Sequence, residues 1–218
     1  MTRVTHMTRL LLCVFVLIIA SNASAAPRLG VEVGGGTVWL SEALAFVGRE
    51  PTWRLDFNCA ATAELDLKPG SSLITGLRYS RLGNDFDHDG STDPSGQGKP
   101  GSTTNLHQYL GVPVLFRWDV PGDSVFLLGG TELLYLMKAA SESEYDDGSG
   151  STGEIEYTDE MNRFNMTLVG GMGTAFSVGS HSLEVTVRYS HGMLKSNDND
   201  RSLGWKTREF ALTLGFRL

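Results

Sequence analysis

Hydrophobic and polar residues alternate with a period of two along most of the chain, and beyond residue 28 no stretch shows the period of an amphipathic helix. The clearest case is residues 53–67, where every odd-numbered position is apolar. The even-numbered positions hold six polar residues and Ala60. Successive side chains of a strand point to opposite faces, so this segment needs one apolar and one polar environment.

Eight segments have the composition and alternation of strands, bounded by Gly, Pro, Asp and Ser. In the last of them the apolar face runs from Phe210 to Leu218 in steps of two. The eight expected strands are residues 29–40, 53–67, 72–82, 107–119, 124–137, 163–176, 182–192 and 209–218.

The connections between these strands alternate in length. Residues 68–71, 120–123 and 178–181 are tight turns rich in Gly, Pro, Ser and Asp, whereas the connections between them are long and polar. The long connections are residues 41–52, 83–106, 138–162 and 193–207. This pattern predicts an all-β fold, namely an eight-stranded antiparallel transmembrane β-barrel with short periplasmic turns and long extracellular loops.

Aromatic residues support the same topology, because they fall near both ends of the expected strands, as in the aromatic girdles of membrane barrels. The alternative is a soluble antiparallel sandwich or barrel with an internal apolar core, and the inner faces of a sandwich would be equally apolar. The outer group is Trp39, Trp53, Tyr79, Tyr135, Tyr189 and Phe210, and the inner group is Trp118, Phe176 and Phe216.

The polar faces distinguish a barrel from a sandwich, because they carry acids and arginines that would meet inside a barrel. An eight-stranded barrel is just wide enough for side chains, so we expect these charges to pair across the lumen and to close it to a wide channel. The expected lumen network is Glu32, Asp56, Glu64, Arg78, Arg117, Arg163, Glu184, Arg188, Glu209 and Arg217, together with Glu132.

Bulk composition alone would suggest a soluble protein. The 218 residues have a mean hydropathy of -0.10, a hydrophobic fraction of 41% and 26 glycines. A membrane barrel has the same averages, because only every second strand position faces lipid. The formal charge of -7 argues against nucleic acid as a partner, since binding phosphates requires clustered cations.

The N-terminus has the three parts of a secretory signal peptide. Arg3 and Arg9 precede an apolar run over residues 10–20, and an Ala-Ser-Ala site then predicts cleavage after Ala25. The apolar run is shorter than the roughly 20 residues that a transmembrane helix requires. We therefore expect residues 1–25 to be a signal peptide and residues 26–218 the barrel domain. Cleavage would leave 16 basic and 25 acidic residues, a charge of -9, and Cys59 as the single cysteine.

One loop resembles the first half of a calcium-binding loop, with carboxylates at every second position before a glycine. These carboxylates are Asp85, Asp87 and Asp89, with Asp93 following. The twelfth position, where a bidentate Glu belongs, is Gly96. A solvated acidic loop is the favoured interpretation, and weak calcium binding is the alternative.

A catalytic alternative rests on His191 near the outer end of a strand. Small outer-membrane barrels that deacylate lipid A carry a Ser two residues after such a His, but here that residue is Met193. Ser190 adjoins His191 and would point to the opposite face of the strand. We therefore expect no enzymatic activity and no cofactor.

The chain resembles the PorT-type outer-membrane β-barrel family. The resemblance is carried by residues 63–65, 77–80, 109–115, 129–130, 134–136, 188–192 and 210–218, which include the Tyr-Leu-Gly-Val-Pro-Val-Leu and Arg-Tyr-Ser-His-Gly segments. It implies an integral outer-membrane protein that the barrel-assembly machinery inserts by reading its last strand, with no shared catalytic residues. A minority of the family serves protein secretion or gliding.

These observations together favour a monomeric outer-membrane barrel of structural or surface-interaction type, exposed to outer-membrane lipid. The alternative function is a narrow pore or a component of a secretion system, and a lipid A deacylase is less favoured.

Overall fold

A computed structural model describes residues 26–41, 54–89, 100–146, 153–194 and 206–218. These ranges contain eight long strands, a two-residue strand β6 (Ile155–Glu156) and one 3-10 turn, η2 (Thr158–Glu160). The long strands are β1 (Arg28–Ser41), β2 (Leu55–Lys68), β3 (Ser71–Asp89), β4 (Pro100–Asp119), β5 (Val125–Tyr145), β7 (Phe164–Val178), β8 (His181–Gly192) and β9 (Lys206–Arg217).

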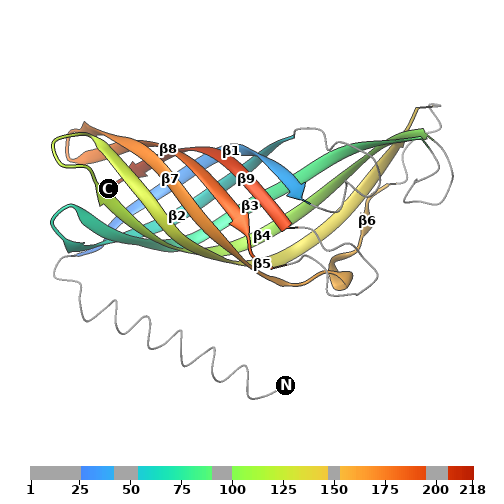
Figure 1. Cartoon of the computed structure of the whole chain (residues 1–218), viewed down its shortest axis with the longest axis horizontal. Coiled ribbons are helices and arrows are strands. Elements are labelled where there is room, and N and C mark those ends of the chain that lie inside the picture. Colours follow the sequence, from blue (N-terminus) through green and yellow to red (C-terminus); the bar gives the residue numbers. More distant parts are fainter. Residues whose placement is uncertain (1–25, 42–53, 90–99, 147–152, 195–205) are drawn as a thin grey trace, which may run out of the picture.

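The eight long strands form one closed antiparallel barrel (Figure 1). Their order is β4-β3-β2-β1-β9-β8-β7-β5, and β4 pairs with β5 to complete the circle. The first and last strands lie side by side, with Gly30 opposite Arg217 and Ser41 opposite Lys206. The predicted all-β, eight-stranded antiparallel barrel is confirmed. Within the described ranges, no helix is long and apolar enough to cross a membrane.

Tight turns gather at one end of the barrel, which we term the inner end. Gly70, Gly122 and Gly179 have φ angles of 75°, 84° and 63°, a left-handed conformation that glycine adopts without steric cost. Each glycine lies in one of the three short connections expected from the sequence. The opposite end, which carries the long connections, is the outer end.

Three strands are longer than their alternation indicates. β3, β4 and β5 continue past the outer ends of the other strands as an antiparallel sheet (Figure 1). In this extension Asp85 pairs with Thr104, and Thr104 pairs with Glu142. The prediction of loops at residues 83–89, 100–106 and 138–145 was therefore wrong. Polar residues predominate in these segments, and their few apolar side chains, such as the buried Ala139, Ala140 and Tyr145, do not produce the regular apolar-polar alternation that marks a strand.

The outward face of the barrel is apolar. Val31, Leu212 and Leu214 are 58%, 53% and 50% exposed, although each lies within a strand that pairs on both sides. Four aromatic residues of the outer group and three of the inner group occupy this face. They are Tyr79, Tyr135, Tyr189 and Phe210 toward the outer end and Trp118, Phe176 and Phe216 toward the inner end. The side chain of Trp39 and all of Trp53 lie outside the described part of the structure.

The outward face predicts a depth-dependent penalty for a charge. We expect Leu214→Arg, between the two aromatic groups, to lower the free energy of unfolding in lipid vesicles by about 2–4 kcal/mol. Leu218→Arg, at the inner end, should cost less than about 1 kcal/mol. Urea titrations followed by tryptophan fluorescence would measure both, and equal small effects would contradict a lipid-facing surface.

Candidate functional site

The lumen contains a connected network of ion pairs toward the inner end. The carboxylate of Glu32 accepts hydrogen bonds from Arg188 at 2.8 Å and from Arg217 at 2.9 Å. Arg217 also binds Glu184 at 3.1 Å, and Arg117 donates to the same carboxylate. All five side chains are buried. The network joins β1, β4, β8 and β9, so it ties together strands from both ends of the chain.

Glu64 extends this network to β2 and to the rim. It accepts a hydrogen bond from Ser72 and another, at 3.0 Å, from Arg28. Arg117 and Arg217 lie 3.8 and 3.7 Å from its two oxygens. A buried charge costs several kcal/mol unless it is paired, and here Glu64 has three guanidinium groups within reach. Arg suits this role because its planar fork of donors can serve two carboxylates at once.

A second group of charges lies between β3, β5 and β9. Arg78 donates to Glu132 and to Glu209, each at 3.1 Å, and all three side chains are buried. Gly111 makes room for this group, because a Cβ there would lie 2.6 Å from Glu132 Oε1. Two carboxylates therefore share a single guanidinium in this part of the lumen.

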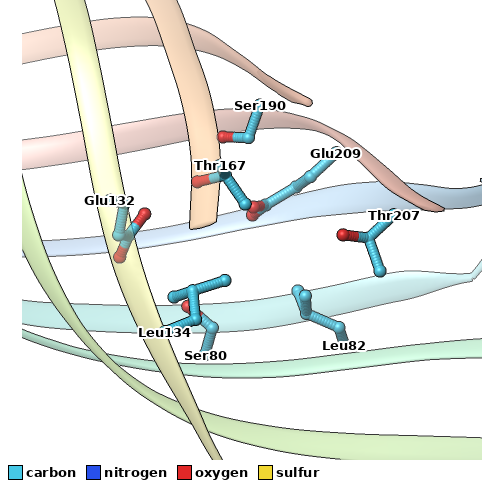
Figure 2. Close-up of a pocket in the computed structure, with 8 residues that line it drawn as sticks. All are labelled: Ser80, Leu82, Glu132, Leu134, Thr167, Ser190, Thr207 and Glu209. Atoms are coloured by element: carbon cyan, nitrogen blue, oxygen red, sulfur yellow. The ribbon is translucent and has the colours of Figure 1, made fainter. Parts of the chain in front are cut away.

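A small polar cavity adjoins Glu132 and Glu209 (Figure 2). Its volume is about 10 Å³, which is room for about one water molecule. Thr167 lines the cavity, and its buried hydroxyl has no hydrogen-bond partner within the described residues. The remaining lining residues are Ser80, Leu82, Leu134, Ser190 and Thr207. With side chains filling the space around it, the described lumen contains no wide channel.

Apolar side chains fill the opposite side of the lumen. The guanidinium carbon of Arg117 lies 3.9 Å from the centre of the Phe126 ring, which places a cation over an aromatic face where the two halves of the lumen meet. The cluster is Ile74, Leu115, Phe126, Leu128 and Val169.

The outer mouth of the barrel is covered by the segment that follows β6. The Tyr157 amide donates to the Ala139 carbonyl at 3.0 Å, and the Ala139 amide donates to the Thr158 hydroxyl at 2.9 Å. The Tyr157 hydroxyl lies 3.1 Å from His107 Nε2, and Met161 packs into an apolar cluster. The other members of this cluster are Val38, Leu82, Tyr109, Leu134, Leu136 and Ala139. This covering was missed from the sequence, where the only signal was an isolated Tyr and Met in a polar connection.

Two predicted lumen residues lie outside both groups. Asp56 is buried near the outer end, where it accepts a 2.7 Å hydrogen bond from the Gly83 amide. Arg163 does not join the network. It lies just before β7 and pairs with Asp159, whose side chain is 95% exposed. Its assignment to the lumen was wrong, because the strand begins one residue later than the alternation suggested.

The expected acidic loop is mostly strand in the structure. Asp85 forms an ion pair with Arg54 at 2.8 Å, and Asp87 is exposed on the outer extension of β3. The side chain of Asp89 and all of Asp93 lie outside the described residues. In the part of the chain that the structure describes, no three His, Cys, Asp or Glu side chains are grouped to hold a metal ion.

The family model of the outer membrane protein beta-barrel domain matches residues 21–198. The chain belongs to this family. The family and the closed barrel together identify the protein as an outer membrane β-barrel. No curated protein matches the chain.

Solved structures of outer membrane barrels are similar at low sequence identity. Neisserial surface protein A is 14% identical with a TM-score of 0.44, and the match covers 87% of this chain and 96% of that one. The translocator domain of the autotransporter NalP from Neisseria meningitidis is 10% identical with a TM-score of 0.41, over 98% and 97% of the two chains. OprG from Pseudomonas aeruginosa is 12% identical with a TM-score of 0.39, over 88% and 96%.

The catalytic alternative finds no geometric support at His191. Ser190 is buried and faces the lumen of this outer membrane barrel, whereas His191 faces outward, as expected for neighbours in a strand. His191 Nδ1 instead lies 3.4 Å from the hydroxyl of Tyr189, which shares its face. The two residues therefore cannot act as nucleophile and base.

The shared guanidinium of Arg78 predicts a strong, rescuable defect. Arg78→Met should lower the free energy of unfolding by about 3–5 kcal/mol, because two buried carboxylates lose their counter-charge. Adding Glu132→Gln and Glu209→Gln should recover at least half of that loss. Urea titration of the refolded proteins would measure these free energies of unfolding. A triple variant no more stable than Arg78→Met would show that the unpaired carboxylates do not cause the loss of stability.

His107 predicts a loss of stability at mildly acidic pH. Outward-facing Arg81 and Gln108 mark the end of the apolar belt, so His107 lies outside the membrane-spanning segments. Burial lowers its pKa from 6.5 to about 4. The unfolded chain then binds more protons between these values, so the contribution to stability is complete above pH 6.5 and falls toward pH 4, by at most about 3 kcal/mol.

Unfolding titrations at pH 7, 5.5 and 4.5 would measure this effect. His107→Gln should flatten the pH dependence of the free energy of unfolding. His181→Gln removes an exposed histidine at the inner turn, far from His107, and should leave that pH dependence unchanged. Parallel curves for His107→Gln and the wild type would contradict the assignment.

Proposed function

We propose that the protein is a structural or surface-interaction barrel of the outer membrane, without catalytic activity. The observation that carries this proposal is the filled lumen, in which ion pairs and apolar clusters leave a cavity of about 10 Å³. Because these side chains occupy the described lumen, the proposal places function on the outer extension and the outward face.

The extension of β3, β4 and β5 supports a role at the cell surface. Its outward face has two rungs in which a hydroxyl lies between two acids, Asp85-Thr104-Glu142 and Asp87-Ser102-Glu144. Glu142 and Glu144 are exposed, as is Asp87. The rungs project an acidic, solvated surface beyond the membrane, as expected for a protein that acts through its extracellular parts.

The route to the membrane is part of the same proposal. We infer that residues 1–25 are a cleavable signal peptide and that the barrel-assembly machinery inserts the mature chain by recognising β9. The resemblance to PorT-type barrels supports a place among the PorT-type members of the outer membrane β-barrel family. Each long strand has exposed apolar side chains, which supports a monomer surrounded by outer-membrane lipid. The net charge of -7 disfavours nucleic acid as a partner.

Fractionation and gel mobility test this function. The protein should remain in the outer-membrane fraction, migrate faster without heating than after boiling, and be labelled from outside intact cells by an amine-reactive, membrane-impermeant reagent. Lys138, beyond the apolar belt, is one target, and Lys138→Arg should reduce the labelling without abolishing it, because Lys206 also lies at the outer end. Recovery from the soluble periplasm would overturn the proposal.

Conductance in planar bilayers separates the structural role from a pore. The wild-type barrel should give no large, steady single-channel current, because Arg78, Glu132 and Glu209 block the lumen. A stable, large conductance would favour the transport alternative, and co-purification with a secretion complex would favour the secretion alternative.

A further inference from the structure

Three strands repeat one order of residues on their outward faces, from the middle of the barrel to its outer end. An apolar residue is followed two positions on by an aromatic one and then by a basic or imidazole side chain. The three series are Leu77-Tyr79-Arg81 on β3, Val187-Tyr189-His191 on β8 and Leu212-Phe210-Arg208 on β9. Residues spaced by two share a face of a strand, so each series is a line along the outer surface.

The series on β8 and β9 lie directly beside one another. Tyr189 is the cross-strand partner of Phe210, and His191 is the cross-strand partner of Arg208. Tyr189 and Phe210 are both exposed, as is Arg208. The Tyr189 and His191 rings lie 6.4 Å apart between centroids. An aromatic pair and a polar pair thus form two successive levels on the same patch of surface.

The basic residues on the outward faces of β8 and β9 contrast with the net negative charge of the molecule. The chain has a formal charge of -7, yet the outward positions of β8 and β9 carry no acid. The acids of these two strands, Glu184 and Glu209, face the lumen and are paired there. Among the described residues, no carboxylate lies within 4.0 Å of the guanidinium groups of Arg81 and Arg208. Within the part of the chain that the structure describes, neither guanidinium is therefore neutralised by a carboxylate.

At the inner end, two strands continue with an apolar residue instead. On β7 the residue two positions beyond Phe176 is Val178, and on β9 the residue two beyond Phe216 is Leu218. Both are exposed and apolar. The inner end does carry basic side chains, because Lys68 is exposed and His181 lies 5.3 Å from Phe216 between ring centroids. Its exposed arginine, Arg28, is paired with Glu64 and Asp66. Among the described residues, the exposed arginines without a carboxylate partner therefore lie at the outer end, which points to a partner that is found in the outer leaflet.

We propose that Arg81, His191 and Arg208, which we term the outer basic band, bind the phosphate groups of outer-leaflet lipids. Aromatic belts mark the depth of the headgroups, and the band lies one outward position beyond the belt. The fork of an arginine matches phosphate in bidentate geometry. The lipid-borne phosphate is favoured over free phosphate because the band continues the lipid-facing surface. This inference rests on the proposed membrane residence and adds a ligand class and its residues.

Lipid selectivity tests the band. Native mass spectrometry of the refolded barrel in neutral detergent would be titrated with diphosphorylated lipid A and with the same lipid after removal of its phosphates. The wild type should bind the phosphorylated lipid about 25-fold more tightly, since Arg81 and Arg208 near an anionic lipid surface each contribute about one factor of five. In Arg81→Gln/Arg208→Gln the preference should fall to about twofold or less.

Three controls decide between the outcomes. Lys68→Gln removes a cation from the inner end and should retain the wild-type preference. Arg208→Lys keeps the positive charge but loses the planar guanidinium, so this variant should retain part of the preference for phosphorylated lipid. Millimolar inorganic phosphate should not displace the lipid; displacement would overturn the lipid-borne assignment in favour of free phosphate.

Every sample would also be tested for heat-modifiable mobility, which reports the folded barrel. A folded wild type without phosphate preference, or a folded double variant that keeps the preference, would overturn the outer basic band and leave the proposed function standing. Recovery of the protein from the soluble periplasm would overturn the proposed function itself, whatever the lipid titration shows.

Discussion

An eight-stranded barrel encloses a space only as wide as the side chains that its own strands point inward. Each strand must therefore supply side chains that fill this space and also satisfy one another. The polar half does this with four arginines and six carboxylates, and the apolar half with the cluster around Phe126. The closed backbone, in turn, leaves the outward face free to be apolar. Width is thus the constraint from which the filled lumen, the ion pairs and the exterior all follow.

The arrangement of charges within that width is uneven. Toward the inner end, Arg117, Arg188 and Arg217 each serve one or more carboxylates, so the pairing is dense. Toward the outer end, Arg78 alone serves Glu132 and Glu209, beside the polar cavity. Apolar packing and the Tyr157 contacts then cover the mouth. From the inner to the outer end, the lumen therefore changes from a dense ionic network to apolar packing.

The strands that span the membrane could be predicted because lipid and lumen impose opposite polarity on alternate positions, as in residues 53–67. The outer extension could not, because polar residues predominate in it without a regular apolar-polar alternation, and only pairing with neighbours makes it a strand. The membership of the lumen network followed from alternation, with Arg163 as the error at a strand boundary. Partners within the network could not be predicted, because the register of β1 against β9 brings Glu32 to Arg217 across 185 residues.

The pairing of β1 with β9 also has a consequence for the order of events during biogenesis. The first strand has its final neighbour on one side only when the last strand of the chain has arrived. Until then Glu32 lacks Arg188 and Arg217, and β1 and β8 each present a row of unpaired backbone groups that can template aggregation. Contacts so distant in sequence make closure slow relative to local pairing. Until β9 pairs with both strands, these two edges are therefore open to pairing with another chain.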